Sequence, residues 1–203
     1  MSRVGKTIIT IPNGVSVEYD GTKVTVTGAK ATLTQEIKAP ITVEITAEKT
    51  VLVKRGNDLP QSRALHGLYN RLIQNMIVGV STGFTKTLIL NGVGYKANLK
   101  GEDLVLNIGY CHPCEVNAEH GVKFKVLTPA EVQNLNLGKE AIGVVVQVMG
   151  ADREKVGALA SKIRDLRKVE PYHLYGIRYA DEFVMRKESK SGKSGGKAGG
   201  KKK

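Results

Sequence analysis

The sequence predicts an α+β protein of two similar tandem domains, each a small antiparallel sheet packed against one helix. Two observations lead to this prediction. Short runs of alternating apolar and polar residues occur in both halves, and each half also contains one stretch whose apolar residues recur at three- and four-residue steps. Alternation is typical of half-buried strands, and recurrence at three- and four-residue steps is typical of an amphipathic helix. We place the domains at residues 1–82 and 83–185, followed by a tail at 186–203.

The first half begins with short, β-branched alternating runs. Gly, Asn, Asp or Pro separates them, which indicates turns between antiparallel strands. The residues that define these runs are Val15, Val17 and Tyr19, then Val24 and Val26, then Val43 and Ile45, then Val51 and Val53.

The period then changes over residues 59–80, which predicts a helix. Asp58 and Ser62 are alternative N-caps, and Gly83 is a suitable stop. The apolar face of this helix is formed by Leu65, Leu68, Leu72, Ile73, Met76, Ile77 and Val80.

The second half repeats this plan. Asp152 is placed to cap its helix, and Pro171 ends it. Residues 20–26 match residues 100–106, and 65–73 loosely match 156–164, which indicates an internal duplication with a period of about 80 to 90 residues. The strands are expected around 87–90, 95–99, 104–108, 122–126 and 143–148, and the buried helix stripe at Val156, Leu159, Ala160, Ile163 and Leu166.

The charge balance favours a polyanionic partner. The 203 residues carry 31 Lys and Arg against 19 Asp and Glu, a net charge of +12. Residues 186–203 alone contain eight basic residues and one acidic residue, and they are too polar to form a core, so we expect them to be disordered when free. Such a tail either solubilises the chain or binds phosphate. We favour phosphate binding, because the cations lack balancing acids.

Other classes of protein find little support. No run approaches the roughly 18 apolar residues of a membrane span, and the N-terminus lacks the apolar region of a signal peptide, so we expect a soluble cytoplasmic protein that makes no membrane contact. No serine-nucleophile elbow, P-loop or metalloprotease motif occurs. We therefore expect no enzyme and no small-molecule substrate.

Two short motifs invite a different interpretation. Residues 92–97 fit the dinucleotide fingerprint, but the residues after them alternate and turn like a hairpin, whereas a cofactor site needs a helix there. Cys111 and Cys114 form one CxxC pair, and a zinc site usually needs a second pair, which His112 and His120 replace poorly. We expect neither a cofactor nor a metal.

The helix of the second half and the residues after it combine cations with tyrosines. Arg and Lys suit phosphates, Tyr can stack on splayed bases, and Gly176 permits close backbone approach. Each tyrosine taken alone is as well explained by packing on the sheet. The candidate RNA-binding residues are Arg153, Lys155, Lys162, Arg164, Arg167, Lys168, Tyr172, Tyr175, Gly176, Arg178 and Tyr179, with Arg186, Lys187, Lys190 and Lys193 in the tail.

Arg178 receives a more specific prediction. It follows Gly176 and precedes Tyr179, which favours a short, exposed, flexible turn in which the guanidinium clasps a phosphate. The alternative is a surface ion pair with Asp181 or Glu182.

Several motifs in order resemble one family. SRVGKTIITIPNGV opens the chain, RALHGLYNRLIQNMIVGVSTGF and LNGVGYKA lie in the middle, and EPY and GIRYADEFVMRK lie near the end. Up to about Lys187, the chain resembles the bacterial-type sixth protein of the large ribosomal subunit.

The resemblance implies two similar α/β domains. It also implies a structural role on large-subunit rRNA, near the sarcin–ricin loop and the stalk base, where translation factors act and ribosomal proteins are neighbours. The second domain would supply much of the RNA contact. By resemblance, the rRNA-binding positions are Lys162, Arg164, Arg167, Tyr172, Gly176, Arg178 and Tyr179.

The chain departs from the family pattern at two places. It reads PYHLYGIRY where relatives typically read PYKGKGIRY, so two lysines are lost around His173, Leu174 and Tyr175. It reads GYCHPC in place of GYSHPV, which indicates that Cys111 and Cys114 are packing variants. The alternative to a ribosomal role is a free RNA-binding protein or RNA chaperone.

Overall fold

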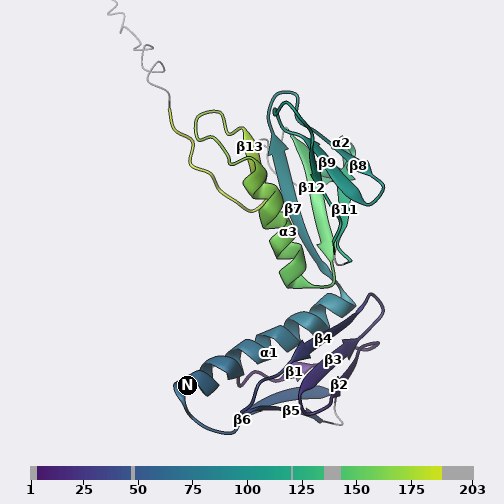
Figure 1. Ribbon diagram of the computed structural model, residues 1–203, viewed down its shortest axis with the longest axis vertical. Coiled ribbons are helices and arrows are strands. Elements are labelled where there is room, and N and C mark those ends of the chain that lie inside the picture. The colour runs from purple at the N-terminus through teal and green to yellow at the C-terminus, as the bar shows by residue number, and fades with distance from the viewer. Residues whose placement is uncertain (1–3, 47–48, 120, 135–142, 189–203) are drawn as a thin grey trace, which may run out of the picture.

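A computed structural model describes residues 4–46, 49–119, 121–134 and 143–188 of the chain. Its two halves follow one another along the long axis of the molecule (Figure 1). Each half has its own hydrophobic core, and neither core draws buried residues from the other half. The α+β class and the tandem repetition predicted from the sequence are confirmed.

The first half contains two antiparallel sheets where the sequence predicted one. The first has the order β1-β6-β5, with β1 at Ile9–Thr10, β6 at Thr50–Arg55 and β5 at Ile41–Thr46. The second has the order β2-β3-β4, with β2 at Ser16–Tyr19, β3 at Lys23–Thr27 and β4 at Thr32–Glu36. Helix α1, Pro60–Ser81, packs against strands of both sheets.

The second half repeats these two sheets and adds a strand. One sheet has the order β10-β9-β8, from Cys114–Val116, Asp103–Asn107 and Lys96–Lys100. The other has the order β11-β12-β7-β13, from Lys123–Leu127, Val144–Gly150, Phe84–Asn91 and Gly176–Tyr179. A short helix α2, Pro129–Asn134, was not predicted. Helix α3, Arg153–Leu166, packs on β7, β12 and β13.

The predicted duplication places equivalent elements in equivalent positions. Strands β3 and β9, which lie in the matching sequence segments, are both the central strand of a three-stranded sheet. The order β1-β6-β5 corresponds to β7-β12-β11, and in each half the helix directly follows the central strand. Strand β13 has no counterpart in the first half, whose chain passes directly from α1 into β7.

The predicted helix ends are partly right. Asp152 caps α3, since its Oδ1 accepts a hydrogen bond from the Glu154 backbone N–H at 3.0 Å. Gly83 ends α1 with a φ of +82°. The N-cap predictions for Asp58 and Ser62 are wrong. The N-cap residue is Leu59, with Pro60 at the first helical position, while Asp58 pairs with Arg55 and buried Ser62 donates to Asn57.

The helix faces agree with the predicted stripes at most positions. In α3, four of the five predicted residues are buried, and Leu166 is partly buried against the same core. In α1, Leu68 is the exception, because it is 50% exposed while its neighbour Tyr69 is buried. The hydroxyl of Tyr69 accepts a hydrogen bond from the Lys38 backbone N–H at 3.1 Å, which explains why a polar aromatic takes the inward position.

The two halves touch where α1 ends and α3 begins (Figure 1). Arg153 Nη1 donates to Asn75 Oδ1 at 3.1 Å across this contact. The guanidinium of Arg153 also lies over the ring of Phe84, 5.8 Å from its centroid. A Cβ atom at Gly79 would overlap the carbonyl oxygen of Ala151, so glycine permits the backbones to approach here.

Candidate nucleic-acid interface

The candidate surface lies on α3 and on residues 167–188. Residues 167–188 are the part that the second half adds to the repeated plan. The turn after α3 is held by backbone hydrogen bonds, from Glu170 N to Tyr175 O at 2.8 Å and from Leu174 N to Glu170 O at 3.0 Å. The Ile177 N–H then donates to Arg167 O at 3.0 Å as β13 begins. This turn is therefore a fixed part of the fold.

Gly176 serves this close packing. Its φ is +141°, and a Cβ atom there would lie 2.7 Å from the carbonyl oxygen of Lys168. A side chain is excluded because the end of α3 and the start of β13 meet at this point. Gly176 was predicted to allow RNA to approach the backbone closely. In the structure, it allows two segments of the protein itself to approach each other.

Arg178 corrects the most specific prediction from the sequence. It lies within β13, opposite Ile89 of β7, and only 8% of the residue is exposed. The prediction of an exposed, flexible turn is wrong, because the residues GIRY form strand β13, which pairs with β7 at the edge of the sheet. Of the two partners proposed in the alternative, Glu182 is the one on which the Arg178 charge acts. The pKa of that carboxyl is lowered chiefly by the Arg164 hydrogen bond and least by the Arg178 charge.

A clamp between Arg164 and Glu182 joins α3 to the chain after β13. Arg164 Nε donates to Glu182 Oε2 at 2.9 Å and Nη2 donates to Oε1 at 2.5 Å, while the Tyr179 backbone N–H donates to Oε2 at 3.2 Å. The Arg164 hydrogen bonds hold the pKa of Glu182 below its ordinary value, against the opposing effect of burial. Arg164 is therefore committed to the fold.

Tyr179 and Arg167 have similar structural contacts. Two cations lie over the Tyr179 ring, with the Arg164 guanidinium 5.7 Å and Lys86 Nζ 5.5 Å from its centroid. Arg167 lies over the ring of Tyr110 at 5.1 Å and donates to Ile108 O at 3.3 Å. These side chains fix the turn and α3 against the sheet.

Six further predicted residues are exposed at the surface. Tyr172 is 44% and Tyr175 41% exposed. Within the described residues, neither Lys162 nor Lys168 has an ion pair. Arg186 Nε donates to Tyr172 O at 3.2 Å and the Lys187 N–H donates to Pro171 O at 2.9 Å, so the start of the tail lies beside the turn. We call the following six residues the outer surface: Lys162, Lys168, Tyr172, Tyr175, Arg186 and Lys187.

The other candidates lie elsewhere. Arg153 lies at the contact between the halves, and Lys155 Nζ is 3.6 Å from Asp152 Oδ2. Lys190 and Lys193 lie outside the described residues. Sequence reasoning missed Lys86 and Tyr110, and it considered Glu182 only as a partner of Arg178. These three residues come from different segments and meet the candidate residues only in the fold.

The aromatic departure from the family pattern forms a small stack. The rings of His173 and Tyr175 are 5.5 Å apart and inclined by 19°. His173 Nδ1 is also 3.2 Å from Glu170 Oε2. The turn thus presents aromatic faces where the family resemblance led us to expect lysines.

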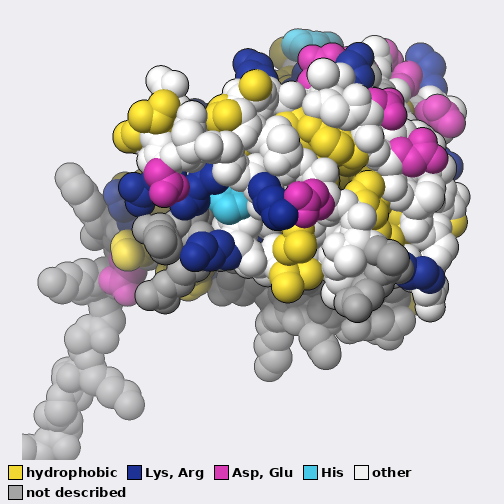
Figure 2. Space-filling model, turned by 90° about the horizontal axis from the view of Figure 1, so that it is seen from below, with side chains coloured by type: hydrophobic (Ala, Val, Ile, Leu, Met, Phe, Trp, Pro, Cys, Tyr) yellow, Lys and Arg dark blue, Asp and Glu magenta, His cyan; other side chains and the backbone are white. Residues whose placement is uncertain are grey.

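Charge is distributed unevenly along the chain. Residues 1–82 carry ten basic and six acidic residues, 83–185 carry thirteen and twelve, and 186–203 carry eight and one. Seen from the end that the first half forms, basic and acidic side chains are intermixed (Figure 2). The net charge is therefore +4 in residues 1–82, +1 in 83–185 and +7 in 186–203, so the second half contributes little to the total.

The short motifs lie in ordinary structural positions. The fingerprint-like residues 92–97 form a turn that leads into strand β8, where a dinucleotide site needs a helix. Cys111 is exposed and Cys114 partly buried, and both are free thiols. Among the described residues, no group of three or more His, Cys, Asp or Glu could hold a metal ion.

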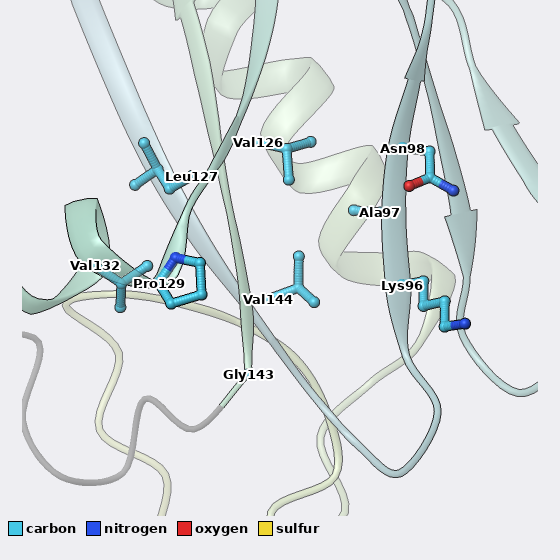
Figure 3. Close-up of a pocket in the computed structure, with 9 residues that line it drawn as sticks. All are labelled: Lys96, Ala97, Asn98, Val126, Leu127, Pro129, Val132, Gly143 and Val144. Atoms are coloured by element: carbon cyan, nitrogen blue, oxygen red, sulfur yellow. The ribbon is translucent and has the colours of Figure 1, made fainter.

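One hollow, of about 480 Å³, lies beside β8 and β11. Figure 3 shows Ala97, Val126 and Val144 facing one another across it, with Lys96 and Asn98 on the outer side of β8. The nine described residues that line it include no acid, histidine, cysteine or serine, so it presents no acid–base pair. Among the described helices, none combines the length and apolar character needed to cross a bilayer.

The fold and the outer surface define a duplicated α+β protein whose second half alone carries a cationic and aromatic extension. Comparison with known proteins agrees with this organisation. The chain belongs to the ribosomal protein L6 family, whose model matches residues 11–83 and 91–180, one segment in each half.

Curated relatives match nearly the whole chain. The large ribosomal subunit protein uL6 of Staphylococcus epidermidis is 46% identical over 193 residues, and that of Clostridium perfringens is 47% identical over 194. The Staphylococcus aureus protein of the same name is 45% identical over 193 residues. Each alignment covers 95% of this chain and the full length of the relative. The family resemblance predicted from the sequence is confirmed.

Proposed function

We propose that this chain is a structural constituent of the large ribosomal subunit that binds large-subunit rRNA and performs no catalysis. The observation that carries the proposal is the outer surface, because five of its six residues lie on the part of the fold that the second half adds. Membership of the ribosomal protein L6 family and full-length similarity to large-subunit proteins support it. The protein is then ribosome-associated and cytoplasmic.

Within this proposal, the outer surface divides into two kinds of contact. Lys162, Lys168, Arg186 and Lys187 neutralise phosphates, and Tyr172 and Tyr175 offer aromatic faces to bases and hydroxyls to phosphates. Structured RNA is read by shape and by unpaired bases, which suits a fixed surface of mixed chemistry.

A second set of predicted residues acts indirectly in this proposal. Arg164, Arg167 and Tyr179 hold α3, the turn and β13 together through ion-pair and cation–π contacts. Gly176 and Arg178 are buried in the same junction. They are positioning residues, because they fix the exposed side chains before RNA arrives and so lower the entropic cost of binding.

We extend the proposal to the location on the ribosome. The family resemblance supports a position near the sarcin–ricin loop and the stalk base, where the protein contacts neighbouring ribosomal proteins and supports the region on which translation factors act. The domains, 1–82 and 83–185, fold separately in this proposal because each has its own core, and the second is the main RNA-binding unit. A fragment of residues 84–187 then binds rRNA more tightly than a fragment of residues 1–82, and equal binding would contradict the assignment.

The salt dependence of binding tests the outer surface. Replacing Lys162 and Lys168 by Ala should lower the slope of log affinity for protein-free large-subunit rRNA against log salt by about 1.5, because two phosphate contacts are lost. Lys38→Ala with Lys96→Ala is the matched control, since both lysines are exposed and neither has an ion pair among the described residues. Deleting residues 186–203 should lower the slope by about three. Slopes equal to the parent's in both variants would contradict the proposal.

A further inference from the structure

The chain that leaves β13 turns at residues 180–181 and continues without regular secondary structure; we call residues 180–187 the strap. Its side chains alternate between the protein and the solvent. Glu182 and Val184 are partly buried, whereas Phe183 is 90% and Met185 71% exposed. Phe183 is the most exposed of the large hydrophobic side chains in the described residues. An aromatic ring in this position contributes almost nothing to the core.

The strap is nevertheless tied down on both sides of Phe183. On the N-terminal side, the Ala180 N–H donates to Thr87 O at 3.0 Å, and Glu182 is held by the Arg164 clamp. On the C-terminal side, Arg186 and Lys187 are hydrogen-bonded to the turn at Tyr172 and Pro171. The backbone of Phe183 is therefore fixed while its ring points outward. Little freedom remains to be lost when the ring makes a contact.

The charges around the strap suit a polyanion. Two acids directly precede Phe183, and each has a cation beside it. Lys86 Nζ lies 3.7 Å from Asp181 Oδ2, and Arg164 grips Glu182. Arg186 and Lys187 follow on the other side of the ring, so a phosphate backbone passing over the strap meets cations close to an exposed aromatic face.

We propose that Phe183 is a stacking platform for an unpaired base of the rRNA, with Met185 as an apolar contact beside it. This inference rests on the proposed function. The phenyl ring has no hydrogen-bonding group, so it can interact only through its face and edge. Every base has a π-face on which such a ring can stack. The contact differs in this from those of Tyr172 and Tyr175, whose hydroxyls can also bind phosphate. The alternative occupant, an apolar pocket of a neighbouring protein, is distinguished by the experiment.

Measuring the affinity for protein-free large-subunit rRNA distinguishes the contribution of side-chain volume at residue 183 from that of aromatic stacking. Phe183→Leu keeps an apolar side chain of similar volume but removes the aromatic face, and we expect about a tenfold loss of affinity, the typical contribution of one base–aromatic stack. Phe183→Tyr should bind like the parent, and the salt slope should be unchanged in both variants because no charge is altered. Leu68→Ala, at an exposed apolar residue on α1 of the first half, is the control and should have no effect.

A fluorescent variant reports the contact directly. The chain contains no tryptophan, so Phe183→Trp introduces a single indole at a site that is 90% exposed. Stacking on a base should quench its emission as protein-free rRNA is added. Emission unaffected by rRNA, together with parental affinity of Phe183→Leu, would overturn the inference. A loss that appears only on large subunits carrying their other proteins would also overturn it, in favour of protein docking.

Failure of the inference can be told from failure of the proposed function. If the parent chain binds rRNA with a steep salt dependence and Phe183→Leu binds equally well, only the stacking platform is wrong. If the parent itself shows no salt-dependent binding, the proposed function is wrong as well. The thermal midpoint of free protein should be the same for parent and Phe183→Leu, because the ring packs against almost nothing in the fold.

Discussion

Two glycines within helices test the contact between the halves, because the same substitution should change stability in opposite directions. Gly79 lies in α1 and Gly157 in α3. Alanine in a helix interior is favoured over glycine by about 0.5–1 kcal/mol. At Gly157 a new Cβ atom would have nothing within 4 Å, so Gly157→Ala should realise this gain.

Gly79→Ala meets a different environment. Its Cβ atom would overlap the carbonyl oxygen of Ala151 and lie 3.0 Å from Phe84 Cε2. The carbonyl belongs to the backbone just before α3, so it cannot turn aside as a flexible side chain does. Overpacking of this kind costs about 1–3 kcal/mol, which exceeds the helix gain. We expect a net loss of about 0.5–2 kcal/mol.

Thermal unfolding of the full chain measures both effects. A change of 1 kcal/mol moves the midpoint by about 2–4 °C for a protein of this size. Gly157→Ala should therefore raise the midpoint by about 1–4 °C, and Gly79→Ala should lower it by about 1–8 °C. A rise for Gly79→Ala equal to that for Gly157→Ala would show that α1 and the chain before α3 do not touch in solution.

Three further perturbations test local features of the second half. Glu182→Gln should lower stability at neutral pH by about 1–2 kcal/mol, because the charge-assisted bonds to a partly exposed Arg164 are lost. Since the folded-state pKa of Glu182 is depressed, its contribution is complete above the unfolded pKa and is lost as pH falls through the folded one. Below the folded-state pKa, Glu182→Gln and the parent should be equally stable. A stability difference that does not change with pH would refute the clamp. The control is Glu188→Gln, at an exposed residue. Lys125→Met should raise the pKa of Glu131, which is held at about 2 chiefly by the Lys125 hydrogen bond and then by those of Thr128, and an unchanged NMR titration would contradict this. Cys111→Ser with Cys114→Val should leave folding and rRNA affinity unchanged, whereas stoichiometric zinc in the parent that the double variant lacks would overturn the packing role.

The repeated plan could be predicted because it depends on local periodicity. The apolar stripe of α3 and its cap at Asp152 follow from residue spacing and from the preference of Asp for N-cap positions. The same reasoning failed at Asp58 and Ser62, where Pro60 begins the helix and both polar side chains find other partners. Several residues competed for the same role, and tertiary contacts decided between them.

The candidate surface was predictable as a region but not residue by residue. The combination of cations and tyrosines after α3 predicts that the surface lies at the C-terminal end of the second half. Whether a given cation faces solvent depended on partners far away in the sequence, such as Tyr110 for Arg167 and Glu182 for Arg164. For Arg178 the decisive contact is with β7, nearly ninety residues earlier. No local pattern carries that information.

Sucrose-gradient fractionation of cell extract, with the protein followed by immunodetection, tests the central claim most directly. A structural constituent of the large subunit should sediment with large subunits and with whole ribosomes, in proportion to their rRNA, and should stay with them through a moderate-salt wash. Recovery of most of the protein in the light fractions, away from both particles, would contradict the ribosomal assignment and favour a free RNA-binding protein or RNA chaperone.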